Sequence, residues 1–65
     1  MLRNRVLELR QAKGMTQEAL ADALRVTRQT VISLEKNRYT PSLEMGFRVA
    51  RIFGLSIEEV FEYAE

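Results

Sequence analysis

Apolar residues recur along this chain at helical spacing, and no stretch of useful length alternates in the way a β-strand does. Leu2, Val6 and Leu9 occupy positions i, i+4 and i+7, which predicts a first helix over residues 2–12, and Gly14 follows as a stop signal. The same spacing predicts four further helices, over residues 17–24, 28–36, 43–53 and 57–63. We therefore expect an all-α fold of five helices.

Hydroxyl side chains stand just before the later helices, where the first turn needs acceptors for its free N–H groups. The expected caps of the second, third and fifth helices are Thr16, Thr27 and Ser56. Glu59 follows Ser56 at the spacing of a capping box. The fourth helix is capped either by Ser42 or by Thr40, with Pro41 then at the first helical position. These caps make the helix starts the best-defined boundaries in the sequence.

The second and third predicted helices are separated only by Arg25, Val26 and the cap Thr27. Such a short connection does not allow two helices of this length to pack side by side, but it suits two helices that cross steeply. This arrangement is a helix-turn-helix. Asn37 is the expected left-handed residue after the third helix, because Asn tolerates positive φ better than most residues.

The outward face of the third helix carries side chains that can read base pairs. Its members are Arg28, Gln29, Thr30, Ile32 and Ser33. Arg can bind guanine, Gln can bind adenine, and an aliphatic side chain can touch the thymine methyl group. The alternative is an ordinary solvated face, although an exposed Ile among short polar residues is an unusual choice for one.

Groups suited to phosphate are expected around that helix. Gln17 lies in the first turn of the second helix, whose free N–H groups attract anions, although it could also be an ordinary surface glutamine. Donor side chains follow the third helix at Asn37, Arg38, Tyr39 and Thr40. A polyanion is therefore the expected ligand.

Composition narrows the functions that remain. The 65 residues include no Cys and no His, which excludes disulfides, thiol catalysis, the usual zinc sites and histidine acid–base chemistry. Glu58, Glu59 and Glu62 are interpreted as charges on a capped helix, so we expect no enzyme, no metal and no cofactor. Residues 1–40 carry eight basic and four acidic side chains, whereas residues 41–65 carry two and five. The basic half is the side expected to face a polyanion.

The chain is short enough to be one domain, residues 1–65. No apolar run approaches a membrane span, and the N-terminus leads into no signal-peptide core. We therefore expect a cytoplasmic protein without a membrane partner. An internal small-molecule pocket is not expected in so short a chain.

Three segments resemble the phage-repressor and Cro-type helix-turn-helix family, also called the XRE family. Residues 15–21 read MTQEALA, residues 26–31 read VTRQTV and residues 39–43 read YTPSL. The resemblance spans residues 5–63 and implies a lambda-repressor-like five-helix bundle whose third helix enters the major groove of double-stranded DNA. It also implies a sequence-specific transcriptional regulator, most simply a repressor.

Position by position, the resemblance assigns base reading to Arg28, Gln29 and Ser33, with Thr30 as a flanking contact. The positions that it assigns to phosphate are Gln17, Thr27, Arg38 and Tyr39, and Gln17 is also able to brace the third helix. It further implies an ion pair between Arg10 and Glu35 that joins the first and third helices. The sequence departs from the family pattern at Arg25, where Gly is usual, and at Ile32, where a small or polar residue is more common.

The fourth and fifth helices carry more apolar residues than a single core can use. The expected dimer interface consists of Met45, Phe47, Ile52, Ile57, Phe61 and Tyr63, with Gly46 allowing close helix approach. Pairing there would set the third helices of the two copies, as recognition helices, about 34 Å apart, as a palindromic operator requires. The alternative is that both faces are covered within the monomer.

A second function remains open from the sequence. The acidic half could hold a partner protein, in an antitoxin-like module that also regulates its own promoter. The two functions overlap, because such modules also bind DNA.

Overall fold

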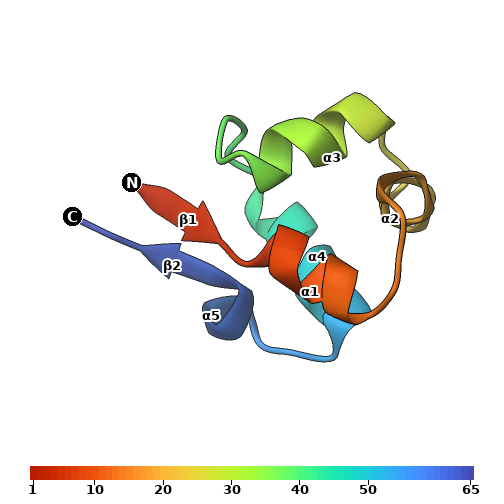
Figure 1. The fold of residues 1–65 in the computed structure, drawn as a ribbon. Coiled ribbons are helices and arrows are strands. Elements are labelled where there is room, and N and C mark those ends of the chain that lie inside the picture. The colour runs from red at the N-terminus through yellow and green to blue at the C-terminus, as the bar shows by residue number, and fades with distance from the viewer.

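Five short helices and a two-stranded ribbon make up the computed structural model, which describes residues 1–65 (Figure 1). The elements in chain order are β1 (Leu2–Asn4), α1 (Val6–Ala12), α2 (Gln17–Leu24), α3 (Arg28–Glu35), α4 (Leu43–Phe53), α5 (Ile57–Val60) and β2 (Phe61–Tyr63). Helix α3 lies along one side of the molecule, and α5 and β2 lie away from it (Figure 1). None of the helices is long and apolar enough to cross a membrane.

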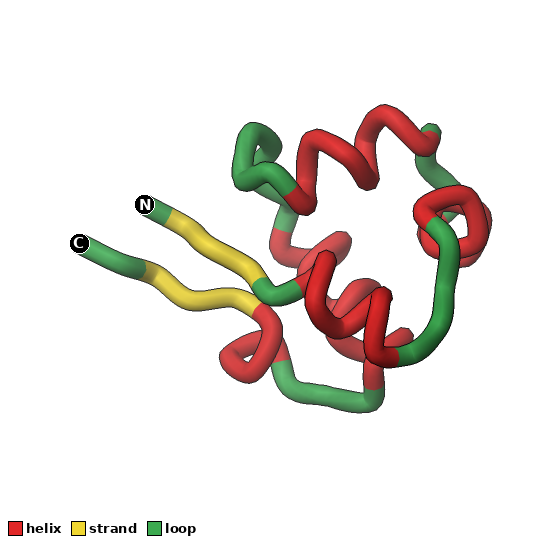
Figure 2. The backbone as a smooth tube through the Cα atoms, viewed as in Figure 1, coloured by secondary structure: helices red, strands yellow, loops and turns green.

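The expectation of an all-α fold is wrong at both ends of the chain. Helix α1 begins at Val6 rather than at residue 2, and α5 ends at Val60 rather than at residue 63. The residues left over form an antiparallel ribbon in which Leu2 faces Tyr63 (Figure 2). Each strand has three residues, too few to display an alternating pattern, and its partner lies at the other end of the sequence. Leu2 matched the helical spacing only by coincidence.

The core is built from one side of every helix. Its nine buried members are Val6, Leu20, Ala21, Leu24, Val31, Leu34, Val49, Ala50 and Val60. Burial of each large aliphatic side chain contributes about 1.5–3 kcal/mol. Helices α2 and α3 contribute five of these residues, which fixes the two helices against each other. Figure 1 shows α2 nearly end-on while α3 lies across the view, so their axes cross steeply, as the short connection predicts.

The predicted helix caps are present. The hydroxyls of Thr16, Thr27 and Ser56 each accept a backbone N–H three residues later. Ser42, rather than Thr40, caps α4, and its Oγ accepts from Met45 N at 3.1 Å. Each hydroxyl satisfies one of the N–H groups that a helix start leaves free. The start of α3 is therefore fixed by its own sequence.

Two residues with side chains have a left-handed backbone, and both lie at a helix end. Arg25 follows α2 with φ 59° and ψ 43°, and Asn37 follows α3 with φ 58°. Asn37 confirms the sequence-based expectation. At Arg25 the backbone has the form that Gly would adopt more easily, so the departure from the family pattern carries a conformational cost.

Candidate nucleic-acid interface

Helix α3 presents its polar face outward and its apolar face to the core. Val31 and Leu34 are buried, whereas Arg28 and Gln29 are exposed. The remaining predicted base readers, Thr30, Ile32 and Ser33, are half-buried at the edges of that face. The structure therefore brings all five predicted side chains to one surface, and their contacts with bases stay a prediction.

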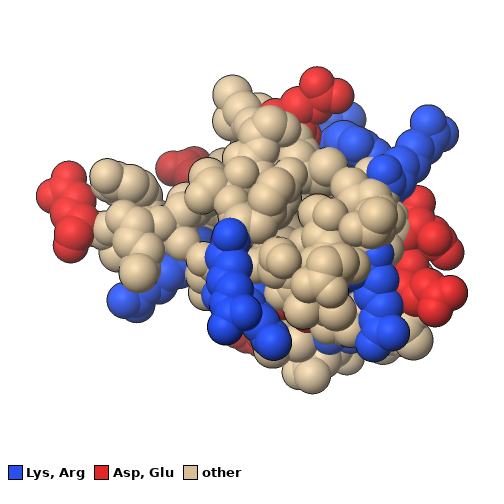
Figure 3. Space-filling model, turned by 90° about the horizontal axis from the view of Figure 1, so that it is seen from above, with Lys and Arg blue, Asp and Glu red and all other residues tan.

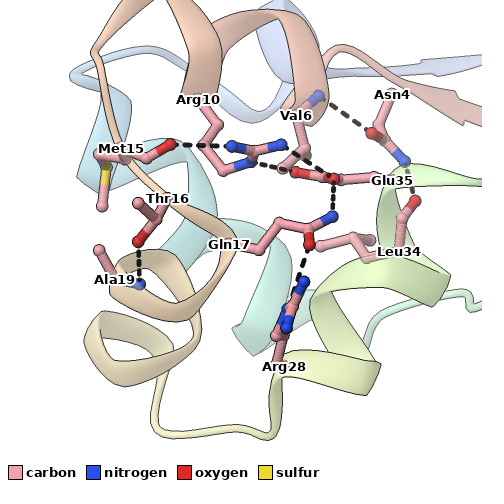
Figure 4. A network of polar contacts seen from close by, with 10 residues as sticks. All are labelled: Asn4, Val6, Arg10, Met15, Thr16, Gln17, Ala19, Arg28, Leu34 and Glu35. Carbon is pink, nitrogen blue, oxygen red and sulfur yellow. Dashed lines mark hydrogen bonds and ion pairs between the residues drawn. The ribbon is translucent and has the colours of Figure 1, made fainter.

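The Arg10–Glu35 ion pair is present and lies beneath that surface (Figure 4). Arg10 Nε lies 2.5 Å from Glu35 Oε2, and the two side chains are only 10% and 5% exposed. The guanidinium also donates to the carbonyl of Met15 at 2.8 Å. Arg10 therefore joins α1 both to α3 and to the segment that leads into α2.

Gln17 extends this ion pair to the surface (Figure 4). Its Nε2 donates to Glu35 Oε1 at 3.1 Å, and its Oε1 accepts from Arg28 Nε at 3.3 Å. The amide of Gln17 therefore has its orientation set from below and in turn favours one position of the Arg28 guanidinium. A side chain ordered before binding loses less conformational entropy when it meets a base.

Because the Glu35 side chain points inward, the exposed surface of α3 carries no carboxylate of its own. Glu35 is the single acidic residue of α3, and its carboxylate is buried against Arg10. Seen from the side of α3, Figure 3 shows a largely uncharged surface in the middle, with both basic and acidic side chains toward its rim. A groove-reading helix without an exposed carboxylate avoids repulsion from the phosphates of DNA.

The loop after α3 starts from a defined helix end. Arg38 N donates to Ser33 O at 2.9 Å and Asn37 N to Leu34 O at 3.0 Å, with Asn37 left-handed between them. This pair of bonds is a Schellman motif, which closes the last turn of a helix. The predicted phosphate residues that follow are all exposed, namely Asn37, Arg38, Tyr39 and Thr40.

Thr27 and Thr30 have a structural task beside their predicted contacts. Thr27 Oγ1 accepts the Thr30 N–H at 3.2 Å, and the two hydroxyls lie 3.0 Å apart. Thr27 is exposed at the start of α3, next to the first turn that faces outward. Each hydroxyl still has a free lone pair or proton for a second partner.

Sequence analysis missed two side chains that hold this surface. Arg48 of α4 donates to Leu24 O at 2.6 Å, which is the carbonyl just before the left-handed Arg25. Asn4 of β1 donates to Leu34 O at 2.8 Å and accepts from Val6 N at 3.0 Å. An Asn can accept the backbone N–H two residues later in an Asx-turn, but the expected helix over residues 2–12 concealed this signal. No local signal indicates the distant carbonyl that Arg48 binds.

The predicted dimer residues divide into two groups. Met45, Ile52, Ile57 and Phe61 pack partly buried against the chain's own core. Phe47 and Tyr63 are 51% and 73% exposed, and Leu43, which sequence analysis did not select, is 71% exposed. The core of the monomer thus uses most of the apolar excess, and only a few apolar side chains remain exposed.

Gly46 serves a contact within the chain. A Cβ built on Gly46 would lie 3.4 Å from Ile57 Cδ1 and 3.7 Å from Phe61 Cε2. The close approach expected at Gly46 is therefore made by α5 and β2 of the same chain.

Comparisons with known proteins agree with this geometry. A family model described as Helix-turn-helix matches residues 6–60. An uncharacterized HTH-type transcriptional regulator of Methanocaldococcus jannaschii is 42% identical over 64 residues, which cover 98% of this chain and 97% of that protein. The cryptic phage CTXphi transcriptional repressor RstR of Vibrio cholerae is 28% identical, over 100% of this chain and 59% of that repressor. A crystal structure of a Bacteroides fragilis protein matches with a TM-score of 0.85 at 24% identity, covering 95% of this chain and 100% of that chain, which shows the shared fold.

Proposed function

The chain belongs to the XRE-type helix-turn-helix family of DNA-binding transcriptional regulators, and on that premise we propose that it is a sequence-specific repressor acting as a homodimer on a palindromic operator. All 65 residues then act as one DNA-binding domain. In this proposal α3 enters the major groove, and the start of α2 and the loop after α3 lie against the phosphates on either side.

The observation that carries the proposal is the ordered path from the buried ion pair to Arg28. Glu35 holds Gln17, and Gln17 holds Arg28, which is exposed at the first position of α3. A guanidinium placed in this way can bind guanine O6 and N7 with two parallel hydrogen bonds. Gln29 and Ser33 would read neighbouring base pairs, with Thr30 and Ile32 bordering them.

The homodimer rests on the exposed apolar patch. Leu43 and Phe47 lie one turn apart on α4, and Tyr63 lies on β2, all of them exposed. A second copy that covers this patch would provide a second recognition helix, with half-sites separated by about one DNA turn of roughly 34 Å. The repressor role is supported by the similarity to RstR.

Selection of bound fragments from random duplex DNA is the first experiment. A recovered motif with two inverted half-sites is expected, and a reporter with that motif over its promoter should lose transcription when the protein is present. Recovery of no motif would contradict sequence-specific binding. A single unpaired motif would contradict the palindromic operator alone.

Titrations of three arginine variants on the selected duplex test the roles of individual side chains. Arg28→Ala should lose about 1–3 kcal/mol and relax selectivity at one base pair, whereas Arg38→Ala should weaken all sequences alike. Arg51→Ala is the matched control, since Arg51 is an exposed arginine of α4 outside the predicted interface. Equal losses on every sequence for Arg28→Ala and Arg38→Ala would refute the division into base and phosphate contacts.

Sedimentation over a concentration series tests the dimer. The wild type should shift from monomer to dimer, and Phe47→Arg should remain a monomer. Leu7→Arg is the control, because Leu7 is also an exposed apolar residue but lies on α1. A wild type that stays monomeric throughout the micromolar range would remove the homodimer from the proposal.

A further inference from the structure

Asn4 connects the terminal ribbon to the end of the recognition helix. Its Nδ2 donates to Leu34 O at 2.8 Å and to Asn37 Oδ1 at 3.1 Å, while its Oδ1 accepts from Val6 N at 3.0 Å. The amide therefore uses both of its donors and one acceptor site on three separate segments. No other side chain of the ribbon has a hydrogen bond to α3 or to the loop that follows.

The bond to Leu34 O falls within the Schellman motif that ends α3. Leu34 O also accepts from Asn37 N at 3.0 Å, so both lone pairs of this carbonyl are used. The second donor of Asn4 binds the side chain of Asn37, whose left-handed backbone turns the chain into the loop. Asn4 thus fixes both the carbonyl and the side chain that set the direction of residues 38–40.

The position of Asn4 is set in turn by the pairing of the two chain ends. Asn4 faces Phe61 across the ribbon, and Arg5 N donates to Val60 O at 2.9 Å. Helix α5 and β2 therefore determine where the Asn4 amide lies, although they are remote from α3 in Figure 1. A shift of β1 along β2 would move the amide away from Leu34 and Asn37.

We propose that Asn4 is a positioning residue for DNA binding, which orients the phosphate-contacting loop at Asn37–Thr40 through its bonds to Leu34 and Asn37. The inference rests on the proposed function, since it requires that this loop faces DNA. Phosphate contacts carry no sequence information, so loss of the Asn4 bonds affects all duplexes alike. Each lost phosphate contact also reduces the salt dependence of binding.

The variant Asn4→Ser separates this role from the start of α1. Ser keeps a side-chain oxygen that can accept from Val6 N, in the manner of an ST-turn, but it is too short to donate to Leu34 O. Asn4→Thr makes the same change with a branched side chain that favours the extended backbone of β1, and it serves if the Ser variant does not fold. Val49→Ala is the control, because Val49 is buried in α4 and its truncation lowers stability without removing a polar contact.

Binding is measured by fluorescence anisotropy on the selected duplex and on a scrambled duplex across a salt series, below the melting temperature of each variant. Asn4→Ser should weaken binding equally on both duplexes, and the slope of log K against log salt should become shallower by about 1, the value for one phosphate contact. Val49→Ala should melt earlier and keep the wild-type slope. In a solely structural role Asn4→Ser would behave in the same way as Val49→Ala.

Two results overturn the inference while the proposed function stands. One is a wild-type slope in both Asn4 variants, and the other is a loss confined to the selected duplex. A wild type that binds neither duplex in a salt-dependent manner overturns the proposed function and this inference together. The Arg28→Ala variant in the same assay distinguishes these cases, because it should lose selectivity and keep most of the salt slope.

Discussion

The buried Arg10–Glu35 pair provides the sharpest prediction about stability. Glu35→Gln has nearly the same shape but no charge, so Arg10 is left as a buried cation without a counter-ion. Removal of one partner of a buried ion pair costs about 3–5 kcal/mol. A domain of this size is stable by about 3–10 kcal/mol, at roughly 0.05–0.15 kcal/mol per residue. The substitution therefore removes a large share of the stability, and in the limit all of it.

Urea and thermal unfolding followed by circular dichroism measure this loss. The matched control is Glu8→Gln, because Glu8 pairs with Arg5 at 3.1 Å but both side chains are more than half exposed. An exposed pair of this kind contributes only about 0–1 kcal/mol. Equal losses for Glu35→Gln and Glu8→Gln would refute the argument from burial.

A double variant separates the ion pair's effect on stability from its effect on binding. Arg10→Met with Glu35→Leu replaces both charges by apolar groups, and such replacements of buried pairs are often neutral or stabilising by about 1–4 kcal/mol. The double variant should recover stability relative to Glu35→Gln. It should still bind the selected duplex less tightly than the wild type, since Gln17 has lost the carboxylate that orients it. Wild-type affinity in a folded double variant would show that Gln17 needs no such support.

Three further substitutions have defined outcomes. Arg25→Gly relieves a left-handed backbone that costs about 1–2 kcal/mol, so the melting temperature should rise by several degrees, and an unchanged or lower value would contradict the assigned strain. Gly46→Ala should stabilise α4 by up to about 1 kcal/mol in urea unfolding, because the added methyl makes an ordinary contact with Ile57, and a loss would mean that Ile57 cannot yield. Hydrogen bonds from the backbone N–H and hydroxyl of Ser56 lower the pKa of Glu59 below its usual 4.5. The contribution of the Glu59 carboxylate to stability is therefore complete above pH 4.5 and is lost as the pH falls through the lowered pKa. The wild type should melt at a higher temperature than Glu59→Gln, and this difference should stay constant above pH 4.5 and shrink below it.

The features that sequence could predict are those with a local cause. The caps at Thr16, Thr27 and Ser56 depend on residues within one turn, and the helix-turn-helix follows from the length of one connection. The ribbon could not be predicted in this way, because Leu2 and Tyr63 meet only after the helices have packed. The same reason applies to Asn4, whose partners at Leu34 and Asn37 lie about thirty residues away.

The same distinction between local and distant causes applies to the residues of the candidate site. The outward position of Arg28 and Gln29 follows from helical periodicity, and the Arg10–Glu35 pair followed from the family resemblance. The bond that places Gln17 between Glu35 and Arg28 depends on the steep crossing of α2 and α3, and sequence indicated only that Gln17 could brace α3. The predicted dimer interface included too many residues, because apolar spacing does not distinguish a residue covered by its own chain, such as Ile57, from one left exposed, such as Phe47.

The pairing of the two chain ends has a consequence for the order in which the molecule assembles. The N-terminal amine of Met1 lies 2.6 Å from Ala64 O, so the ribbon closes a loop that contains nearly every residue. Closing so long a loop has a large entropic cost that the few bonds of the ribbon offset only when the helices are already packed. We expect the ribbon to form last in folding and to open first. In native-state hydrogen exchange, the amide hydrogens of residues 2–4 and 61–63 should therefore exchange faster than those of α2 and α3. Equal protection in both regions would mean that the ends close together with the core as one cooperative unit.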